Sequence, residues 1–106
     1  MAKFLIQASY TLEGTKGLLK EGGTGRRTAV EQAIKGLGGK LDVFYFAFGH
    51  TDVFLIADLP DAVSAAAVSL TVNAAGGAKA ITIPLMMPEE MDTATKKSVQ
   101  YRAPGR

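Results

Sequence analysis

An α+β domain is expected for this chain, with a four-stranded antiparallel sheet that carries two helices on one of its faces. The clearest indication is a polar turn at residues 49–52 between two apolar runs, a pattern typical of a β-hairpin. A segment with helical periodicity lies on each side of this hairpin. Strand-like segments lie near both ends, so the predicted order is strand, helix, strand, strand, helix, strand.

The first strand is expected over residues 3–10, where polarity alternates along the chain. One face carries Phe4, Ile6, Ala8 and Tyr10, and the other carries Gln7 and Ser9. Residues 11–27 contain five glycines. We therefore expect a turn there, a short helical piece around residues 17–20, and a flexible loop.

The first long helix is expected from Thr28, because apolar side chains then recur at helical spacing. They are Ala29, Val30, Ala33, Ile34 and Leu37. Thr28 could form a capping box with Glu31, and Thr24 is an alternative cap. Gly38 and Gly39 are expected to end the helix, since glycine readily adopts the left-handed conformation found at helix ends.

A second helix is expected after the hairpin, because Asp61 can accept hydrogen bonds from its free N–H groups. It should end near Ala75. Its inner side is expected to hold Val63, Ala66, Ala67 and Leu70. The last strand is expected over residues 78–87, and Pro84 indicates an edge position because proline cannot donate to the ladder.

This order of elements is that of the ferredoxin-like fold. Right-handed crossovers place both helices on the same face of the sheet, so the other face has no helix. The hairpin strands nevertheless carry apolar side chains on both faces. In the hairpin strand before the turn, one face carries Leu41, Val43, Tyr45 and Ala47 and the other carries Phe44, Phe46 and Phe48. In the hairpin strand after the turn, one face carries Val53, Leu55 and Ala57 and the other carries Phe54 and Ile56.

With these phenylalanines and Ile56 on the helix-free face, the apolar patch would exceed what a soluble monomer usually exposes. At about 25 cal/mol per Å², covering it offers on the order of 10 kcal/mol before ordering costs. We therefore expect the partner to be a second copy of the chain, stacked sheet against sheet. The assembly would be a homodimer or a higher symmetric oligomer, with any small-molecule cavity inside or beside the interface.

Length and composition fit one globular domain, which we place at residues 1–91. Residues 92–106 form a polar, mildly basic tail, expected to be disordered unless Val99 and Tyr101 anchor it to a partner subunit. The chain has no cysteine, which excludes disulfides and indicates a cytoplasmic protein. A net charge of +2 without a basic stripe disfavours nucleic-acid binding, and no apolar run is long enough to span a membrane.

His50 and Asp52 are candidate site residues in the hairpin turn. The only histidine, His50, could act as a general base or a metal ligand, although a solvated turn residue is the simpler interpretation. Asp52 could pair with His50 or accept hydrogen bonds from nearby backbone N–H groups. With one histidine and no cysteine, we expect no metal site and no tightly held cofactor.

Two arginines and two tyrosines complete the candidate ligand-binding residues. Arg26 and Arg27 follow a glycine-rich segment at a helix start and could bind a phosphate or a carboxylate, or lie solvated in a surface loop. Tyr10 and Tyr45 could line a cavity and orient a polar ligand, or belong to the structural core.

Several segments of the chain resemble the GYD-domain family, small bacterial and archaeal proteins related to the dimeric α/β-barrel proteins. The likeness spans about residues 3–91. It is carried by residues 4–10, 11–14, an arginine at 26 or 27, and residues 38–41, 44–56, 59–61 and 88–91. The Gly-Tyr-Asp triplet of the family is only partly kept: Gly49 and Asp52 are present, but Thr51 stands in place of the tyrosine. If that tyrosine serves chemistry, this chain lacks it.

The resemblance implies a ferredoxin-like fold and self-association but no established activity. The leading hypothesis is a homo-oligomeric protein that binds a small apolar or aromatic molecule, or acts by association alone. Analogy with dimeric α/β-barrel relatives gives an alternative, a cofactor-independent oxygenase or isomerase that uses His50, Tyr10, Tyr45 or Arg26. A third hypothesis is an anion-sensing regulatory module built on Arg26 and Arg27. Nothing in the sequence decides whether the protein is an enzyme.

Overall fold

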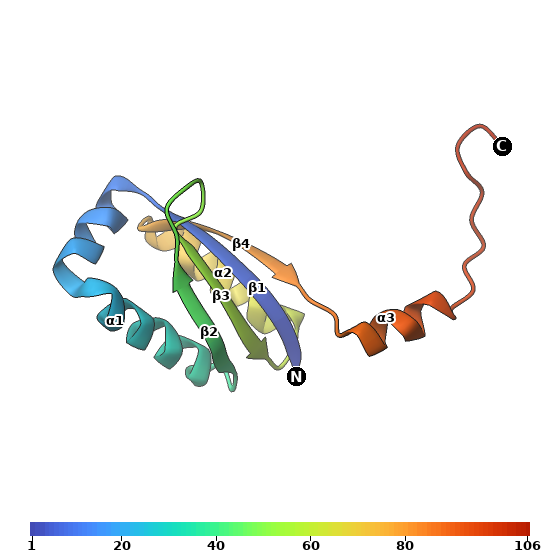
Figure 1. The fold of residues 1–106 in the computed structure, drawn as a ribbon, viewed down its shortest axis with the longest axis horizontal. Helices are drawn as coiled ribbons and strands as arrows, with labels where there is room; N and C mark the ends of the chain where they lie inside the picture. Colours follow the sequence, from blue (N-terminus) through green and yellow to red (C-terminus); the bar gives the residue numbers. More distant parts are fainter.

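The computed structural model describes residues 1–106 and contains the expected elements in the expected order (Figure 1). They are β1 (Ala2–Tyr10), α1 (Leu12–Gly36), β2 (Lys40–Phe46), β3 (Val53–Leu59), α2 (Ala62–Ala75), β4 (Ala78–Pro84) and a third helix, α3 (Pro88–Thr95). The strands form one antiparallel sheet in the order β2-β3-β1-β4. This confirms the α+β, ferredoxin-like architecture and the edge position of β4.

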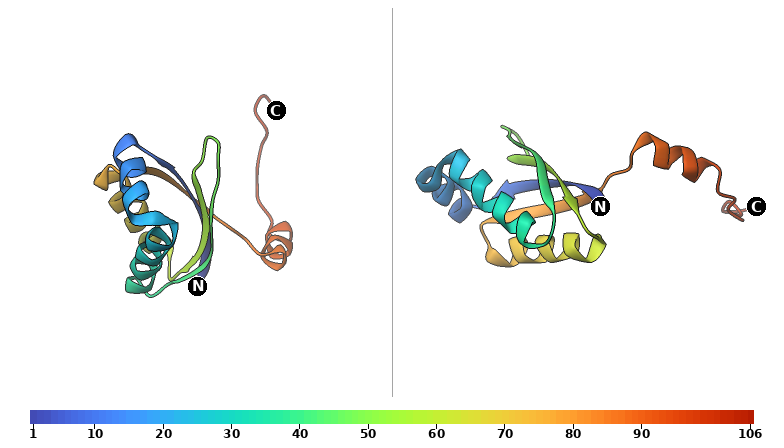
Figure 2. Two further views of the ribbon diagram at one scale, coloured as in Figure 1. Left: turned by 60° about the vertical axis from the view of Figure 1, so that its left-hand side comes forward. Right: turned by 90° about the horizontal axis from the view of Figure 1, so that it is seen from below.

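Both α1 and α2 lie on one side of the sheet, which we call the helix face (Figure 2). The opposite side, the open face, carries no helix. The buried core lies between the helix face and the two helices. It consists of Phe4, Ile6, Ile34, Val53, Leu55, Ala57, Leu59, Ala65 and Ala80. Nine buried residues are few for 106, so much apolar surface stays uncovered within one subunit.

Helix α1 begins at Leu12, so the expectation of a turn and a flexible loop over residues 11–27 is wrong. Thr11 caps the helix, and its hydroxyl accepts a hydrogen bond from the Gly14 amide at 3.2 Å. The helix is interrupted only at Gly22, whose φ is 80°. Residues with a Cβ rarely adopt this left-handed conformation. Thr28 is inside the helix and donates to the Thr24 carbonyl, so neither threonine is a cap.

Two glycines of α1 allow close packing against other elements. Gly14 lies directly against the backbone carbonyl of Gly77, at the turn between α2 and β4. The ring of Phe46 lies against Gly23, with a ring carbon 3.0 Å from the point where a Cβ would be. Tertiary contacts therefore override the low helix propensity of glycine in this segment.

Helix α2 has the predicted ends, but its predicted inner face is wrong. The Asp61 carboxylate accepts from the Ser64 amide at 2.8 Å, and Gly76 ends the helix in the left-handed conformation. The side that packs on the sheet instead carries Ala65, Val68 and Val72. Val63, Ala66, Ala67 and Leu70 are exposed. Because α2 is apolar on every side, the sequence pattern could not fix its rotation.

A β-bulge in β2 changes which side chains reach each face. Leu41 pairs with Ala57 and Val43 pairs with Ile56, so Asp42 is an extra residue that shifts the alternation of the strand. The expected set of Leu41, Val43, Tyr45 and Ala47 is therefore split: Leu41 packs on the core, while Val43 and Tyr45 lie on the open face.

The expected position of the phenylalanines on the open face is wrong for two of them. Phe44 packs against the core, and Phe46 touches it edge to face with 5.2 Å between ring centroids. Phe48 lies fully exposed in the hairpin turn. The predicted opposition within β3 is confirmed, because Val53, Leu55 and Ala57 are buried on the helix face. Phe54 and Ile56 therefore lie on the open face.

The chain continues beyond the sheet as α3 and an irregular segment, residues 96–106. Met87 precedes the helix, and its amide donates to the Glu90 carboxylate at 2.9 Å. Val99 and Tyr101 are exposed. None of the three helices combines the length and hydropathy that crossing a membrane requires.

Replacing Gly14 with alanine is expected to destabilise the protein by about 1 to 3 kcal/mol, because the new Cβ would overlap the rigid carbonyl of Gly77. Gly17→Ala is the matched control in the same half of α1, since a Cβ there meets nothing within 4 Å. The control should stabilise by up to about 1 kcal/mol through helix propensity. Urea denaturation measures both, and equal stabilities for the two variants would contradict the close packing at Gly14.

Candidate ligand cavity and open face

A cavity of about 460 Å³ lies between the helix face of the sheet and the helices α1 and α2. Most of its lining is apolar and includes Ile6, Val30, Phe44, Leu55, Val68 and Val72. Helix α1 is interrupted at Gly22, and residues before and after this point line the cavity. Its size and lining are those of a typical small-molecule site.

Tyr10, Glu21 and Arg26 form a polar cluster in this apolar cavity. Arg26 and Glu21 make an ion pair at 3.4 Å between Nη1 and Oε2, across the bend at Gly22. Burial raises the pKa of the Tyr10 phenol. The positive charge of Arg26 opposes this rise, and the negative charges of Asp52 and Glu21 reinforce it. The Tyr10 phenol is therefore a neutral hydrogen-bond donor at physiological pH.

One atom of this cluster has no partner. The Nε–H of Arg26 is buried and makes no hydrogen bond. A buried donor without an acceptor costs free energy, and a group left in this state at a cavity wall is a natural position for a ligand acceptor. Of the candidates named from the sequence, the cavity brings together Tyr10 and Arg26 only.

Asp52 has a structural role at the base of the hairpin turn. Its carboxylate accepts from the Tyr10 amide at 2.8 Å, its own amide donates to the Ala8 carbonyl at 2.9 Å, and its carbonyl accepts from the Ala47 amide at 2.8 Å. These bonds tie the turn to β1. They agree with the interpretation of Asp52 as a residue that binds backbone N–H groups.

The remaining candidates lie away from the cavity. His50 is exposed at the hairpin tip, where its carbonyl accepts from the Ser9 hydroxyl at 2.7 Å. Arg27 is exposed on α1 and is not part of the cavity wall, so the two arginines do not converge. Tyr45 is 66% exposed on the open face, opposite Phe54 and on the other side of the sheet from Tyr10.

The open face carries an apolar band that consists of two neighbouring rows of side chains, each running across all four strands. The strand register places Val43, Ile56, Leu5 and Ile83 in one row and Tyr45, Phe54, Gln7 and Ile81 in the next. Gln7 is the single polar residue among these eight, and Ile81 is 55% exposed. Polar residues bound the band at both ends, with Ser9 and Lys79 on one side and Lys3 and Asp58 on the other.

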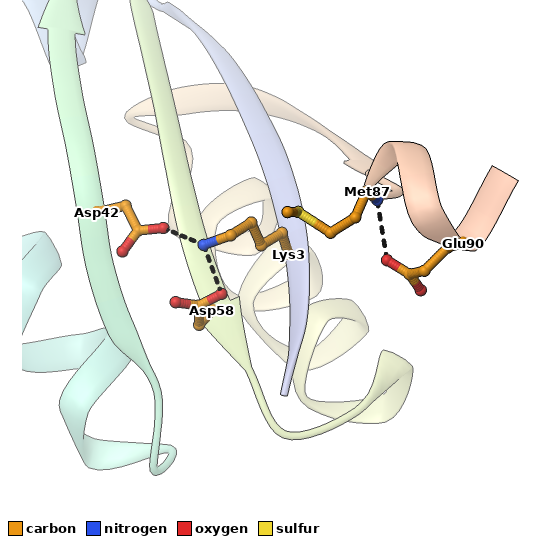
Figure 3. Close-up of polar contacts among 5 residues, drawn as sticks. All are labelled: Lys3, Asp42, Asp58, Met87 and Glu90. Atoms are coloured by element: carbon orange, nitrogen blue, oxygen red, sulfur yellow. Dashed lines mark hydrogen bonds and ion pairs between the residues drawn. The ribbon is translucent and has the colours of Figure 1, made fainter. Parts of the chain in front are cut away.

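Lys3 links two carboxylates at one end of this band (Figure 3). Its Nζ atom contacts Asp42 in the bulge and Asp58 on β3, the latter at 3.0 Å. The hydrogen bond to Lys3 lowers the pKa of Asp42, and the bonds to Asp42 and Asp58 raise the pKa of Lys3. Lys3 and Asp42 therefore stay charged at neutral pH, and together with Asp58 they form a polar border to the apolar band.

Two features of these surfaces were not predicted. Glu21 was not a candidate, because its pairing with Arg26 depends on the bend at Gly22 and no regular helix spacing indicates it. Val43 and Tyr45 could be assigned to the open face only once the bulge at Asp42 was known. No group of three or more His, Cys, Asp or Glu side chains is arranged to hold a metal ion.

Asp52→Ala is expected to lower the free energy of unfolding by about 1 to 3 kcal/mol, because the Tyr10 amide loses its acceptor. Asp52→Asn keeps an acceptor oxygen and should cost clearly less. His50→Ala, in the same turn, is the control and should change stability little, since its side chain makes no hydrogen bond there. Urea denaturation distinguishes the three variants, and a harmless Asp52→Ala would contradict this role.

Comparison with known proteins shows to which family the chain belongs. Neither the curated proteins nor the solved structures gave a significant match. The model of the GYD domain matches residues 4–95, from β1 to the end of α3. Because this match covers most of the 106 residues, the chain belongs to the GYD-domain family.

Proposed function

We propose that this protein binds a neutral, mainly apolar small molecule in the cavity on the helix face, and that it works as a homo-oligomer joined through the open face. The observation that carries the ligand proposal is the buried Nε–H of Arg26, which has no hydrogen-bond partner, on a residue that lines a mainly apolar cavity. This cavity lies on the side of the sheet opposite the open face, whereas the sequence led us to expect a ligand cavity inside or beside the sheet interface.

Charge argues for a neutral ligand. Besides Arg26, the cavity wall includes the carboxylates of Glu13 and Glu21. A ligand carboxylate would meet these two negative charges and would compete with Glu21 for Arg26. A ketone or hydroxyl oxygen can instead accept from the Arg26 Nε–H while the ion pair stays intact. The Tyr10 phenol offers a second donor in the same cluster.

The proposed assembly has the anatomy of a protein interface. The apolar band of the open face is bounded by charged and polar residues, as the core of an interface is by its rim. A band of this kind that spans four strands is more apolar surface than a monomer usually exposes. A second copy offers the same band, and a two-fold axis matches the two.

Of the other hypotheses, the enzyme remains compatible with the cavity, because Glu21 can accept a proton and Tyr10 can donate one to a bound carbonyl compound. The anion sensor has less support. Its glycine-rich segment is helical, and Arg27 does not lie with Arg26.

Ligand recognition can be tested with 2-acetonaphthone, 2-naphthoate and naphthalene, which share a ring system and differ in their polar group. The ketone should bind most tightly, and Arg26→Met should weaken it about tenfold through the loss of a charged donor. Naphthalene should bind Arg26→Met and the unaltered protein alike. Arg27→Met is the control and should change nothing. Isothermal titration calorimetry measures these affinities, and tightest binding of naphthoate would contradict a neutral ligand.

The assembly can be tested with Ile81→Lys, which puts a charge into the apolar band. Sedimentation velocity should show an oligomer for the unaltered chain and an 11.1 kDa monomer for the variant. Leu19→Lys is the control, because Leu19 is 84% exposed on α1 and away from the sheet. Circular dichroism should show the same fold in all three. A monomeric unaltered protein at micromolar concentration would refute the assembly.

A further inference from the structure

We propose that residues 85–106, here called the C-terminal arm, are held by a second copy of this chain, so that each subunit of the dimer clasps the other. This inference rests on the proposed assembly through the open face and adds a second contact to it. The occupant of the open face and the receiver of the arm are then the same partner subunit.

The arm is separate from the rest of its own subunit. Helix α3 makes no extensive contact with any strand or with α1 or α2. The molecule is 56 Å long, and its radius of gyration is 16.8 Å, against about 13 Å for a compact chain of this length. Figure 1 shows that α3 and the C-terminal segment account for this elongation.

Helix α3 has the features of a helix made to pack. Pro88 starts it, the Glu90 carboxylate accepts from the Met87 amide, and Glu89 and Glu90 lie in its first turn. An isolated helix of eight residues is marginal in water, so these features imply support from another surface. Its spacing also provides an apolar stripe of Met87, Met91 and Ala94 opposite the polar Glu89 and Thr93.

The direction of the arm points to the subunit that would support it. The Leu85 amide donates to the Lys3 carbonyl at 2.9 Å, and the chain then leaves the sheet. The left view of Figure 2 places α3 on the opposite side of the sheet from α1 and α2, which is the side of the open face, and the right view places it beyond the end of the strands. Figure 3 shows the Met87 side chain beside Lys3, at the border of the apolar band.

A second copy seated on the open face would therefore lie next to this arm. Figure 1 shows that the segment after α3 is separated from the sheet and lies beyond the ends of the strands. Apolar side chains are exposed along the whole arm: Met86, Met87, Met91, Val99 and Tyr101. Flexible methionines suit a contact of this kind, since they adapt to an irregular surface.

Cross-linking of isotopically mixed protein tests the exchange of arms. Unlabelled and ¹⁵N-labelled chains are unfolded, mixed, refolded together and treated with a lysine-reactive cross-linker. Lys96 and Lys97 in the arm should link to lysines of the domain, such as Lys3, Lys40 or Lys79, in peptides of mixed isotope. Links found only within one isotope, or no links from the arm in a stable dimer, would overturn the proposal.

A matched pair of variants tests the contribution of the arm. Met91→Glu places a charge on the apolar stripe and should raise the dimer dissociation constant at least tenfold in sedimentation equilibrium. Thr93→Glu adds the same charge on the opposite side of α3 and should change it less than threefold. Equal effects would overturn the arm contact while leaving the stacked sheets intact, whereas a monomeric unaltered chain would refute both.

Discussion

A sheet has two faces, and this chain has too little helix to cover both. Two helices lie on one face, and even there the bend in α1 leaves a space instead of a packed layer. Only nine residues are buried as a result. The cavity beneath the helices and the uncovered apolar band thus have the same origin, and each is a surface on which a ligand or a partner gains free energy by burying apolar area.

Much of the fold could be predicted, because alternation along β1 and β3 and the caps at Asp61 and Gly76 are local signals. The errors arose where local signals were silent or misleading. Five glycines in residues 11–27 indicated a loop, but the small size of two of them lets α1 approach its neighbours: Gly14 lies against Gly77 and Gly23 against Phe46. A single added residue, Asp42, reversed the faces assigned to the side chains that follow it in β2.

The candidate site was less predictable for the same reasons. Residue type suggested two tyrosines, two arginines and a turn with His50 and Asp52, but only Tyr10 and Arg26 line the cavity together. The rotation of the helix after Gly22 decides which arginine faces the cavity. The alternation of side chains along β1 and β2 decides which tyrosine does so. Asp52 has the second of its two expected roles, because its carboxylate accepts from the Tyr10 amide.

The bend at Gly22 divides α1 into two helical segments, each of which has its own contacts with the rest of the domain. The first is pinned at Thr11 and Gly14 to the turn before β4, and the second is fixed by Ile34 in the core. The angle between the two parts of α1 sets the distance between this helix and the sheet over the cavity. A change in this one backbone angle would therefore alter the volume of the cavity without replacing any side chain that lines it.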